Sequence, residues 1–318
     1  MEFRTPISIP KSKHAIGYDS KIFSIGSCFA ENMAKKLEFF KFQNNTNPFG
    51  IIFNPVSIEN VIDRIVNQKL FTENDIFFYN ERWHCFEVHS DVSHPDKDIF
   101  LGTLNKIVTD LHPLFTNFSH YYITYGTSWV YRNIPKGFIV ANCHKVPQNQ
   151  FVKEILSTEG IQKSIQKTIE LIHSVNPKGM IVFTVSPVRH LKDGFVENQR
   201  SKAHLISAIH NLLENEDLRD NAEYFPSYEI VMDELRDYRF YAEDMLHPNQ
   251  IAIDYIWEKF KMSSISEASY LIMNEVESIQ RGMAHRPFNE QSESHKQFKS
   301  KLLEKTLSLT EKYPFMRF

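Results

Sequence analysis

Two short segments of the sequence contain residues that can carry out acyl transfer. The first is Gly26-Ser27-Cys28-Phe29-Ala30, and the second is Asp244-Met245-Leu246-His247. A serine hydroxyl becomes a nucleophile when an imidazole accepts its proton, and a carboxylate on the other imidazole nitrogen fixes the tautomer. Each segment alone also fits a plain turn or a helix cap. Together they predict Ser27 as nucleophile, His247 as base and Asp244 as the residue that orients the base.

The residues around Ser27 predict a sharp strand-to-helix turn. Residues 21–25 form a short apolar run of strand type, and Phe29, Met33 and Leu37 then recur at helical spacing. A serine at the start of a helix lies beside free N–H groups and the positive end of the helix dipole. Both features stabilise a negative charge that forms on a substrate oxygen.

The rest of the chain alternates between strand and helix patterns. Apolar periodicity predicts helices at 161–172, 206–213 and 252–260, the last capped by Asn249, and buried or half-buried strands at 121–131, 180–185 and 224–232. Residues 72–100 are expected to form an irregular insertion or a β-hairpin near the site. This alternation predicts an α/β fold, a three-layer sandwich with a mostly parallel sheet, in which ligands bind beyond the carboxyl ends of the strands.

The last part of the chain differs from the rest. Ile272, Val276, Ile279 and Met283 form one helical stripe, and Phe298, Leu302 and Leu309 indicate a second helix. We therefore expect one α/β domain over residues 1–262 and a helical C-terminal extension over residues 263–318 that packs on it.

Composition excludes several classes of function. The 318 residues include 36 Lys and Arg and 39 Asp and Glu, so the net charge of −3 offers no basic surface for nucleic acid. Three scattered cysteines predict neither a disulfide framework nor a zinc site. The histidines lack metal-binding spacing, and we expect no metal or cofactor. No secretory signal or membrane-length apolar run is evident, so we expect a cytoplasmic, soluble protein without a membrane partner.

Several separated motifs resemble those of the GSCFA family, whose signature stands here at residues 26–30. The resemblance covers about residues 20–260 and includes NPFGIIFNP at 47–55, YGTSWVY at 125–131, NCHKVP at 142–147, TVSPVRH at 184–190 and LRDYRFYAEDMLHPN at 235–249. It implies an SGNH-like (flavodoxin-like) α/β hydrolase fold and ester or acyl chemistry, with catalytic residues in the order Ser, Asp, His.

The sequence departs from the usual SGNH pattern at two places. Gly26 replaces the aspartate that usually precedes the serine, and Gly126-Thr127-Ser128-Trp129 lacks the asparagine of the G-x-N-D block. The oxyanion donor must therefore come from elsewhere. The candidates are the Ser27 and Gly50 backbone N–H groups and the side chains of Ser128 and Asn142, of which the Asn142 amide is preferred.

Other residues near these motifs are candidates for substrate binding: Cys28, Gly126, His144, Lys145, Arg189 and His190. Cys28 is also a rival nucleophile, because a helix N-terminus lowers the pKa of a thiol. Arg189 could hold an anionic group or form a surface salt bridge. The alternating charges of residues 236–239 are expected to form a buried ion-pair network that positions the Asp244 loop.

These residues predict a serine-dependent ester hydrolase or acyltransferase that forms an acyl-Ser27 intermediate. The expected partner is a small-molecule or carbohydrate-linked ester, and the oligomeric state is left open. The alternative is a catalytically silent SGNH-like module that binds a carbohydrate or acyl ligand. A metal-dependent hydrolase is a third possibility, because His144, His190 and His247 could converge at one cleft.

Overall fold

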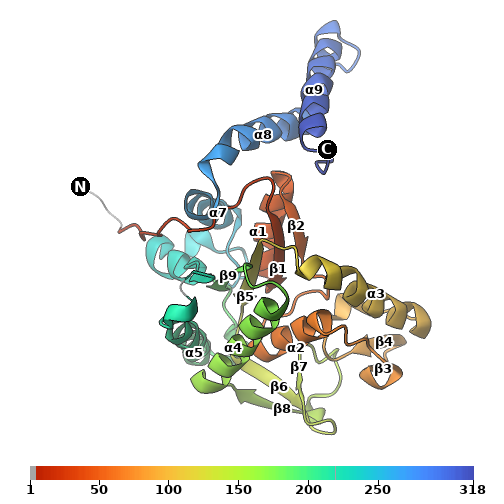
Figure 1. Ribbon diagram of the computed structural model, residues 1–318, viewed down its shortest axis with the longest axis vertical. Helices are drawn as coiled ribbons and strands as arrows, with labels where there is room; N and C mark the ends of the chain where they lie inside the picture. Colours follow the sequence, from red (N-terminus) through yellow and green to blue (C-terminus); the bar gives the residue numbers. More distant parts are fainter. Residues whose placement is uncertain (1–4, 219) are drawn as a thin grey trace.

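The centre of the protein is a parallel sheet of five strands, shown in Figure 1. The computed structural model describes residues 5–218 and 220–318, so residues 1–4 of the expected domain lie outside the described part. The strands are β1 (Lys21–Gly26), β2 (Gln43–Thr46), β5 (His120–Tyr125), β9 (Met180–Val185) and β10 (Ala222–Tyr224). Their spatial order is β10-β9-β5-β1-β2, which equals the 2-1-3-4-5 order of flavodoxin-like sheets. The chain reverses its direction of winding between β1 and β5, where such folds bind ligands.

Both faces of the sheet are covered by helices. Against one face pack α2 (Pro55–Val66), α3 (Lys97–Phe115), α4 (Thr158–Val175) and α5 (Phe195–Leu213), and against the other pack α1 (Cys28–Phe39) and α7 (Gln250–Ser264). The predicted α/β architecture with a parallel sheet is therefore confirmed. The predicted helices at 161–172, 206–213 and 252–260 are present, and the second begins eleven residues earlier than its apolar stripe.

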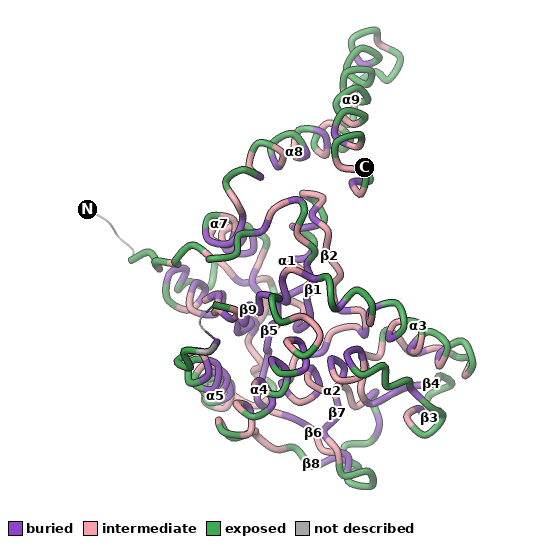
Figure 2. The backbone as a smooth tube through the Cα atoms, viewed as in Figure 1, coloured by how far each residue is buried: buried purple, intermediate pink, exposed green. Residues whose placement is uncertain are grey.

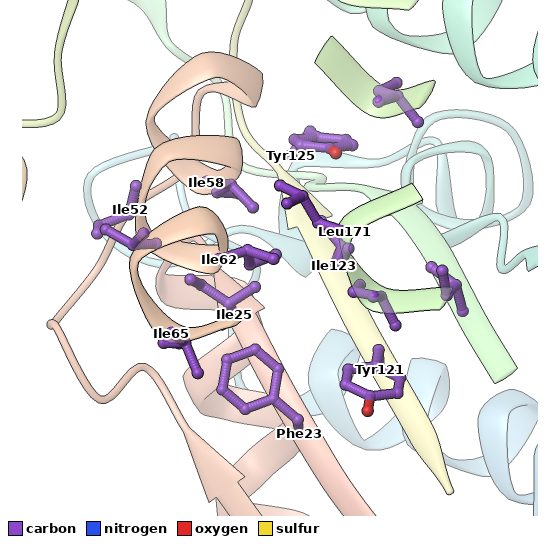
Figure 3. Close-up of a cluster of buried hydrophobic side chains, with 14 of the residues drawn as sticks. Phe23, Ile25, Ile52, Ile58, Ile62, Ile65, Tyr121, Ile123, Tyr125 and Leu171 are labelled. Carbon is purple, nitrogen blue, oxygen red and sulfur yellow. The ribbon is translucent and has the colours of Figure 1, made fainter. Parts of the chain in front are cut away.

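Alternate residues along each central strand enter two different cores. Phe23, Ile25, Tyr121 and Ile123 face α2 and α4, as Figure 3 shows. Their chain neighbours, such as Ile22 and Tyr122, face α1 and α7. Every residue of β5 and β9 is buried, as expected for inner strands of a parallel sheet. The sheet is therefore held from both sides, which makes its carboxyl edge a rigid support.

The predicted strand over residues 121–131 is two strands that belong to different sheets. β5 ends at Tyr125, and β6 (Trp129–Asn133) joins β7 (Ile139–Val140) and β8 (Phe151–Ile155) in a small antiparallel sheet. Between them, the Gly126 N–H donates to the Phe53 carbonyl oxygen and the Ser128 N–H to Ser201 Oγ. These bonds draw the chain out of the central sheet. Residues 72–100 contain the hairpin of β3 (Ile76–Tyr79) and β4 (Arg82–Cys85), as predicted.

The predicted strand over residues 224–232 is wrong beyond its first residue. Strand β10 ends at Tyr224, and residues 227–235 form a helical turn (α6, Ser227–Glu229) followed by a short π-helix. Pro226 has no N–H for a ladder, and Ser227 Oγ donates to the Val185 carbonyl oxygen instead. The apolar residues Ile230 and Val231 are buried against α7 rather than in the sheet.

The C-terminal segment is helical, as predicted. Helices α8 (Tyr270–Ala284) and α9 (Glu293–Lys312) project beyond α7 in Figure 1, and Figure 2 shows that much of their surface is exposed. The chain then returns to the α1 corner, where the Tyr313 ring lies 5.5 Å from that of Tyr18. Gln280 Nε2 donates to the Phe39 carbonyl oxygen. The division of the chain at residue 262 stays a prediction. Among the described residues, no helix is both long and apolar enough to cross a membrane.

Gly26 is the position where a side chain would most directly distort the sheet. Its φ is +150°, and a Cβ there would lie 2.3 Å from the Thr124 carbonyl oxygen. We expect Gly26→Ala to lower the free energy of unfolding by about 1–3 kcal/mol, the usual cost of such backbone strain. Denaturant unfolding measures this change.

Gly102→Ala is the matched control. Gly102 lies inside α3, and a Cβ added there would meet no atom within 4 Å, so alanine should raise stability by about 0.5–1 kcal/mol. Equal stabilities of the Gly26→Ala variant and the wild type would contradict the close contact between β1 and β5.

Candidate functional site

Ser27 lies at the carboxyl end of β1, next to the position where the sheet changes its winding direction. It is the N-cap of α1, and its Oγ accepts a hydrogen bond from the Phe29 N–H at 3.2 Å. The Ser27 N–H donates to the Thr124 carbonyl oxygen, and the Gly26 N–H donates to Asn47 Oδ1. The predicted strand-to-helix turn is therefore present. Ser27 is only 2% exposed, so its side chain is buried at the carboxyl edge of the sheet and does not lie on the surface.

Asp244 and His247 form a tightly bonded pair. Asp244 Oδ1 accepts the N–H groups of Leu246 and His247 at 2.9 and 3.0 Å, and Oδ2 lies 2.6 Å from His247 Nδ1. These two backbone bonds, followed by the imidazole, lower the pKa of Asp244 to about 2. Since an ionised carboxylate only accepts hydrogen bonds, Nδ1 must carry the proton. In the neutral imidazole, Nε2 then carries no proton and is free to accept a proton.

The loop that carries this pair is anchored to the segment that follows β9. The Arg189 N–H donates to the Leu246 carbonyl oxygen at 3.1 Å, and the Ala242 N–H donates to the His247 carbonyl oxygen. Asn249 caps α7 through the Ala252 N–H and donates from Nδ2 to the Arg239 and Tyr241 carbonyl oxygens. The charge of His247 acts on His190, which follows β9. Within the described residues, no hydrogen bond joins Ser27 to His247.

Most of the expected oxyanion donors already have partners. The Gly50 N–H donates to the Asn47 carbonyl oxygen at 2.8 Å. The Ser128 hydroxyl is fully buried and donates to the Ser201 carbonyl oxygen. The Ser27 N–H is bonded to Thr124. Asn142 differs, because its Oδ1 accepts the His144 N–H and its Nδ2 has no partner in the described part of the chain.

A pocket of about 330 Å³ lies between the end of β5 and the small antiparallel sheet. Asn142, Cys143 and His190 line it, together with Trp129 and Lys153. Burial, with the charges of Lys202 and His247, lowers the pKa of His190 to about 3, so this ring is neutral at physiological pH. Its Nε2 is buried with no protein partner among the described residues. The wall of the pocket therefore contains a neutral imidazole whose Nε2 is buried and unpaired among the described residues.

Of the six predicted substrate-binding residues, only His190 lines this pocket. His144 is buried against His84, with Nε2 2.7 Å from the Cys85 carbonyl oxygen. Lys145 is exposed. The Arg189 guanidinium lies 4.0 Å from the centre of the Tyr241 ring, in a separate hollow. Gly126 directly follows β5, and its N–H and carbonyl oxygen are both bonded within the protein.

The expected buried ion-pair network at residues 236–239 is wrong. Arg239 pairs with Asp237 at 2.9 Å and Arg236 with Asp233 at 4.0 Å, and all four side chains are largely exposed. Neutral groups hold the Asp244 loop instead, chiefly Asn249 and the backbone of Arg189.

The pKa values of the thiols are not lowered as the helix dipole predicts for Cys28. Burial raises the pKa of the Cys28 thiol, with Glu31 adding to the effect, and these outweigh the N–H groups of Phe29 and Cys28. Burial raises the pKa of Cys143 to about 11. Cys28, Cys85 and Cys143 are all free. Among the residues that the structure describes, no group of three or more potential ligands could hold a metal ion.

Lys202 is a site residue that the sequence analysis missed. It is fully buried, and its Nζ donates to the carbonyl oxygens of Gly126 and Ser186, both at 2.6 Å. These groups lie directly beyond the ends of β5 and β9. The sequence signal that could have found it is a lysine at the spacing of the buried positions of α5. The buried face of this helix includes Asn198, Ser201, Lys202, Leu205 and Ile209.

Asp244 allows a direct test of this loop. A carboxylate with a lowered pKa stabilises the fold above its unfolded pKa of about 3.9, and this contribution is lost as pH falls through about 2. We expect ¹³C carboxyl NMR to place the Asp244 titration near pH 2. In His247→Ala the midpoint should rise only partly, because the backbone donors remain. A midpoint that returns to the ordinary value in this variant would show that the imidazole alone holds the carboxylate.

Known families match the chain over most of its length. Residues 21–260 match the model of the GSCFA family, and residues 276–318 match the model described as the GSCFA domain protein, C-terminal domain. No curated protein matches the chain. The motifs that place Ser27, His190 and the Asp244–His247 pair at one edge of the sheet all lie inside the first matched range. The chain belongs to the GSCFA family.

Proposed function

We propose that the protein is a serine-dependent ester hydrolase or acyltransferase of SGNH type, with Ser27, Asp244 and His247 as its catalytic residues. The observation that carries this proposal is the Asp244–His247 pair: two backbone N–H groups hold the carboxylate, and its bond to Nδ1 favours the imidazole tautomer needed for base catalysis. The pair is tied to Arg189 in the segment that follows β9, and the carboxyl end of β9 lies at the same edge of the parallel sheet as that of β1. In doubly wound folds this edge is where ligands bind.

The reaction proceeds by two transfers of the acyl group. Ser27 Oγ attacks the ester carbonyl carbon while His247 Nε2 takes the hydroxyl proton, and the carbonyl oxygen becomes an oxyanion. The C–O bond to the alcohol then breaks, and His247 returns the proton to the leaving oxygen. Water, or an acceptor hydroxyl in a transferase, then attacks the acyl-Ser27 ester by the same steps and releases Ser27. Asp244 stays ionised throughout and stabilises the charged imidazole.

Attack requires a rearrangement around Ser27. Its Oγ accepts the Phe29 N–H, and it is almost fully buried. Catalytic hydrogen bonds are often long or absent without substrate and tighten in the complex. The Asp244–His247 pair is more open to solvent than Ser27, with both side chains about 45% exposed, and we propose that substrate binding brings the pair and Ser27 together.

The pocket indicates the class of substrate. Beside Trp129 and Tyr131, it contains polar groups from Asn142, Gln148 and Lys153. Lys153 Nζ lies over both aromatic rings and is ion-paired with Asp193. Aromatic rings combined with several fixed polar groups suit a ligand with apolar ring faces and many hydroxyls. We propose an O-acylated carbohydrate as the substrate, with the sugar in this pocket.

The second candidate function is a silent module that binds such a ligand. One observation favours it: the Ser27 hydroxyl has a structural role as the cap of α1. Under this alternative the pocket binds the ligand, and no covalent bond forms at Ser27.

Labelling with a fluorophosphonate probe tests the proposed function. We expect covalent modification at Ser27, located by peptide mapping, because the probe reacts with serines activated by a base. His247→Ala should abolish labelling, and Asp244→Asn should reduce it by orders of magnitude, about 10⁴-fold where the tautomer is lost.

Cys28→Ser is the control for this labelling, and it should leave modification of Ser27 intact. If the folded protein is not labelled and small activated esters are not hydrolysed, the silent module becomes the better account. Modification of Cys28 in place of Ser27 would overturn the choice of nucleophile.

Asn142→Asp tests the oxyanion donor. This change keeps the Oδ1 acceptor for the His144 N–H but removes the amide donor. We expect kcat for a p-nitrophenyl ester to fall by about 10²–10³-fold, as on loss of one oxyanion donor elsewhere. Gln148→Glu, which changes an amide in the same pocket, is the control and should affect KM more than kcat. An unchanged kcat in Asn142→Asp would exclude this amide as the donor.

A further inference from the structure

Lys202 is a charged group buried in the protein without an acidic partner. It is 0% exposed, although lysine is almost never fully buried unless it is paired. Among the described residues, no carboxylate forms an ion pair with it. Its hydrogen bonds go to two main-chain carbonyl oxygens instead, those of Gly126 and Ser186. The ammonium charge is therefore solvated by peptide dipoles and not neutralised.

The two carbonyl groups lie where the central sheet opens. The β5–β9 ladder ends at the pair Tyr125 and Val185, and the next residues are Gly126 and Ser186. The Ser186 N–H still donates to Tyr125, but beyond this point the chain of β5 turns toward the small sheet. Lys202 Nζ spans the gap between the diverging strands, and so satisfies two buried acceptors at the carboxyl edge.

The groups that face Lys202 belong to the candidate site. Its charge acts on the Cys28 thiol of α1, next to Ser27, and on the His190 ring that lines the pocket. The Tyr228 ring of α6 also lies near Lys202, 5.7 Å from Nζ. The ammonium thus lies at the carboxyl ends of β5 and β9, where its charge acts on Cys28 and His190.

We propose that Lys202 is a positioning residue of this site, which fixes the ends of β5 and β9 and places an uncompensated positive charge behind the Ser27–Cys28 turn. The catalytic role of this charge rests on the proposed function: if Ser27 is the nucleophile, a positive charge at this place stabilises the anion that develops there. The charge acts through the protein interior, since Lys202 does not reach the surface.

Burial makes this charge responsive to pH near neutrality. Desolvation lowers the pKa of Lys202 to about 7, partly offset by Cys28. The positive charge is therefore present below about pH 7 and lost above it. The Cys28 thiol, which this charge also affects, has other charged and polar neighbours: Glu31 raises the pKa of Cys28, and the N–H groups of Phe29 and Cys28 lower it.

Alkylation of Cys28 reports this charge without any reaction at Ser27. The full chain with Cys143→Ser leaves Cys28 as the partly accessible thiol, because Cys85 is buried. In Lys202→Met, iodoacetamide should modify Cys28 more slowly than in the parent below pH 7, because the Cys28 thiolate loses a charge that lowers its pKa. The difference should disappear above about pH 8, because Lys202 is then neutral in the parent as well.

Ser201→Ala is the matched control from the adjacent position of α5. Ser201 Oγ is buried and bonds Ser128 and Thr127, so this change removes hydrogen bonds from the same region without removing a charge. We expect no pH-dependent change in Cys28 alkylation. If Lys202 has a purely structural role, Lys202→Met will change the rate of Cys28 alkylation equally at every pH, or will not change it. Either result overturns the proposal.

A second measurement uses the wild-type chain, in case Lys202→Met does not fold. With ¹³Cε-labelled lysine, one resonance should titrate near pH 7 and show contacts to the α-protons of Gly126 and Ser186, while exposed lysines titrate near 10.4. If no lysine titrates below pH 9, the proposal is overturned. Because neither readout requires acylation of Ser27, loss of the esterase proposal would leave both tests valid.

Discussion

The close contact between Gly26 and Thr124 fixes the strand-to-helix turn that carries Ser27. The Ser27 N–H continues the β1–β5 ladder by bonding the Thr124 carbonyl oxygen, and a Cβ on Gly26 would collide with that oxygen. The chain can therefore pass from strand to helix in a single residue. This places Ser27 at the start of α1 and beside the carboxyl end of β5, where the sheet changes its winding direction. A larger residue at position 26 would push the turn away from β5.

Polar groups gather at this edge because the strands separate there. Beyond Tyr125 and Val185, backbone carbonyl groups no longer have ladder partners, and Lys202 supplies donors to two of them. The same opening leaves the His190 nitrogen buried without a partner beside the pocket, as far as the described residues extend. Burial lowers the pKa of both His190 and Lys202, since removal from water disfavours the charged form of each group. The edge is thus a region of low dielectric, where hydrogen bonds to a ligand are stronger than in water.

The Asp244–His247 pair is built by local geometry, in contrast to the rest of the site. Three residues of loop place two N–H groups and one imidazole around a single carboxylate. Met245 makes this possible with a φ of +58°, a conformation that few side chains adopt. Neutral bonds from Asn249 and Arg189 then hold the loop against the sheet. Both side chains of the pair are about 45% exposed, whereas Ser27 is buried.

Local patterns in the sequence determined the elements and the chemical character of the site. The apolar run at 180–185, the stripe at 161–172 and the Asn249 cap were all predictable, because strand burial, helix periodicity and capping depend on neighbouring residues. The Asp244–His247 pair was predictable for the same reason. The tertiary structure alone decided that residues 121–131 divide between two sheets and that residues 227–235 are helical, since contacts with Phe53, Ser201 and Val185 override the local preference. It also decided that the Ser128 hydroxyl is already bonded and that Lys202 lies beneath the site, because each depends on a bond between residues 73 or 76 positions apart that meet only when the sheet is assembled.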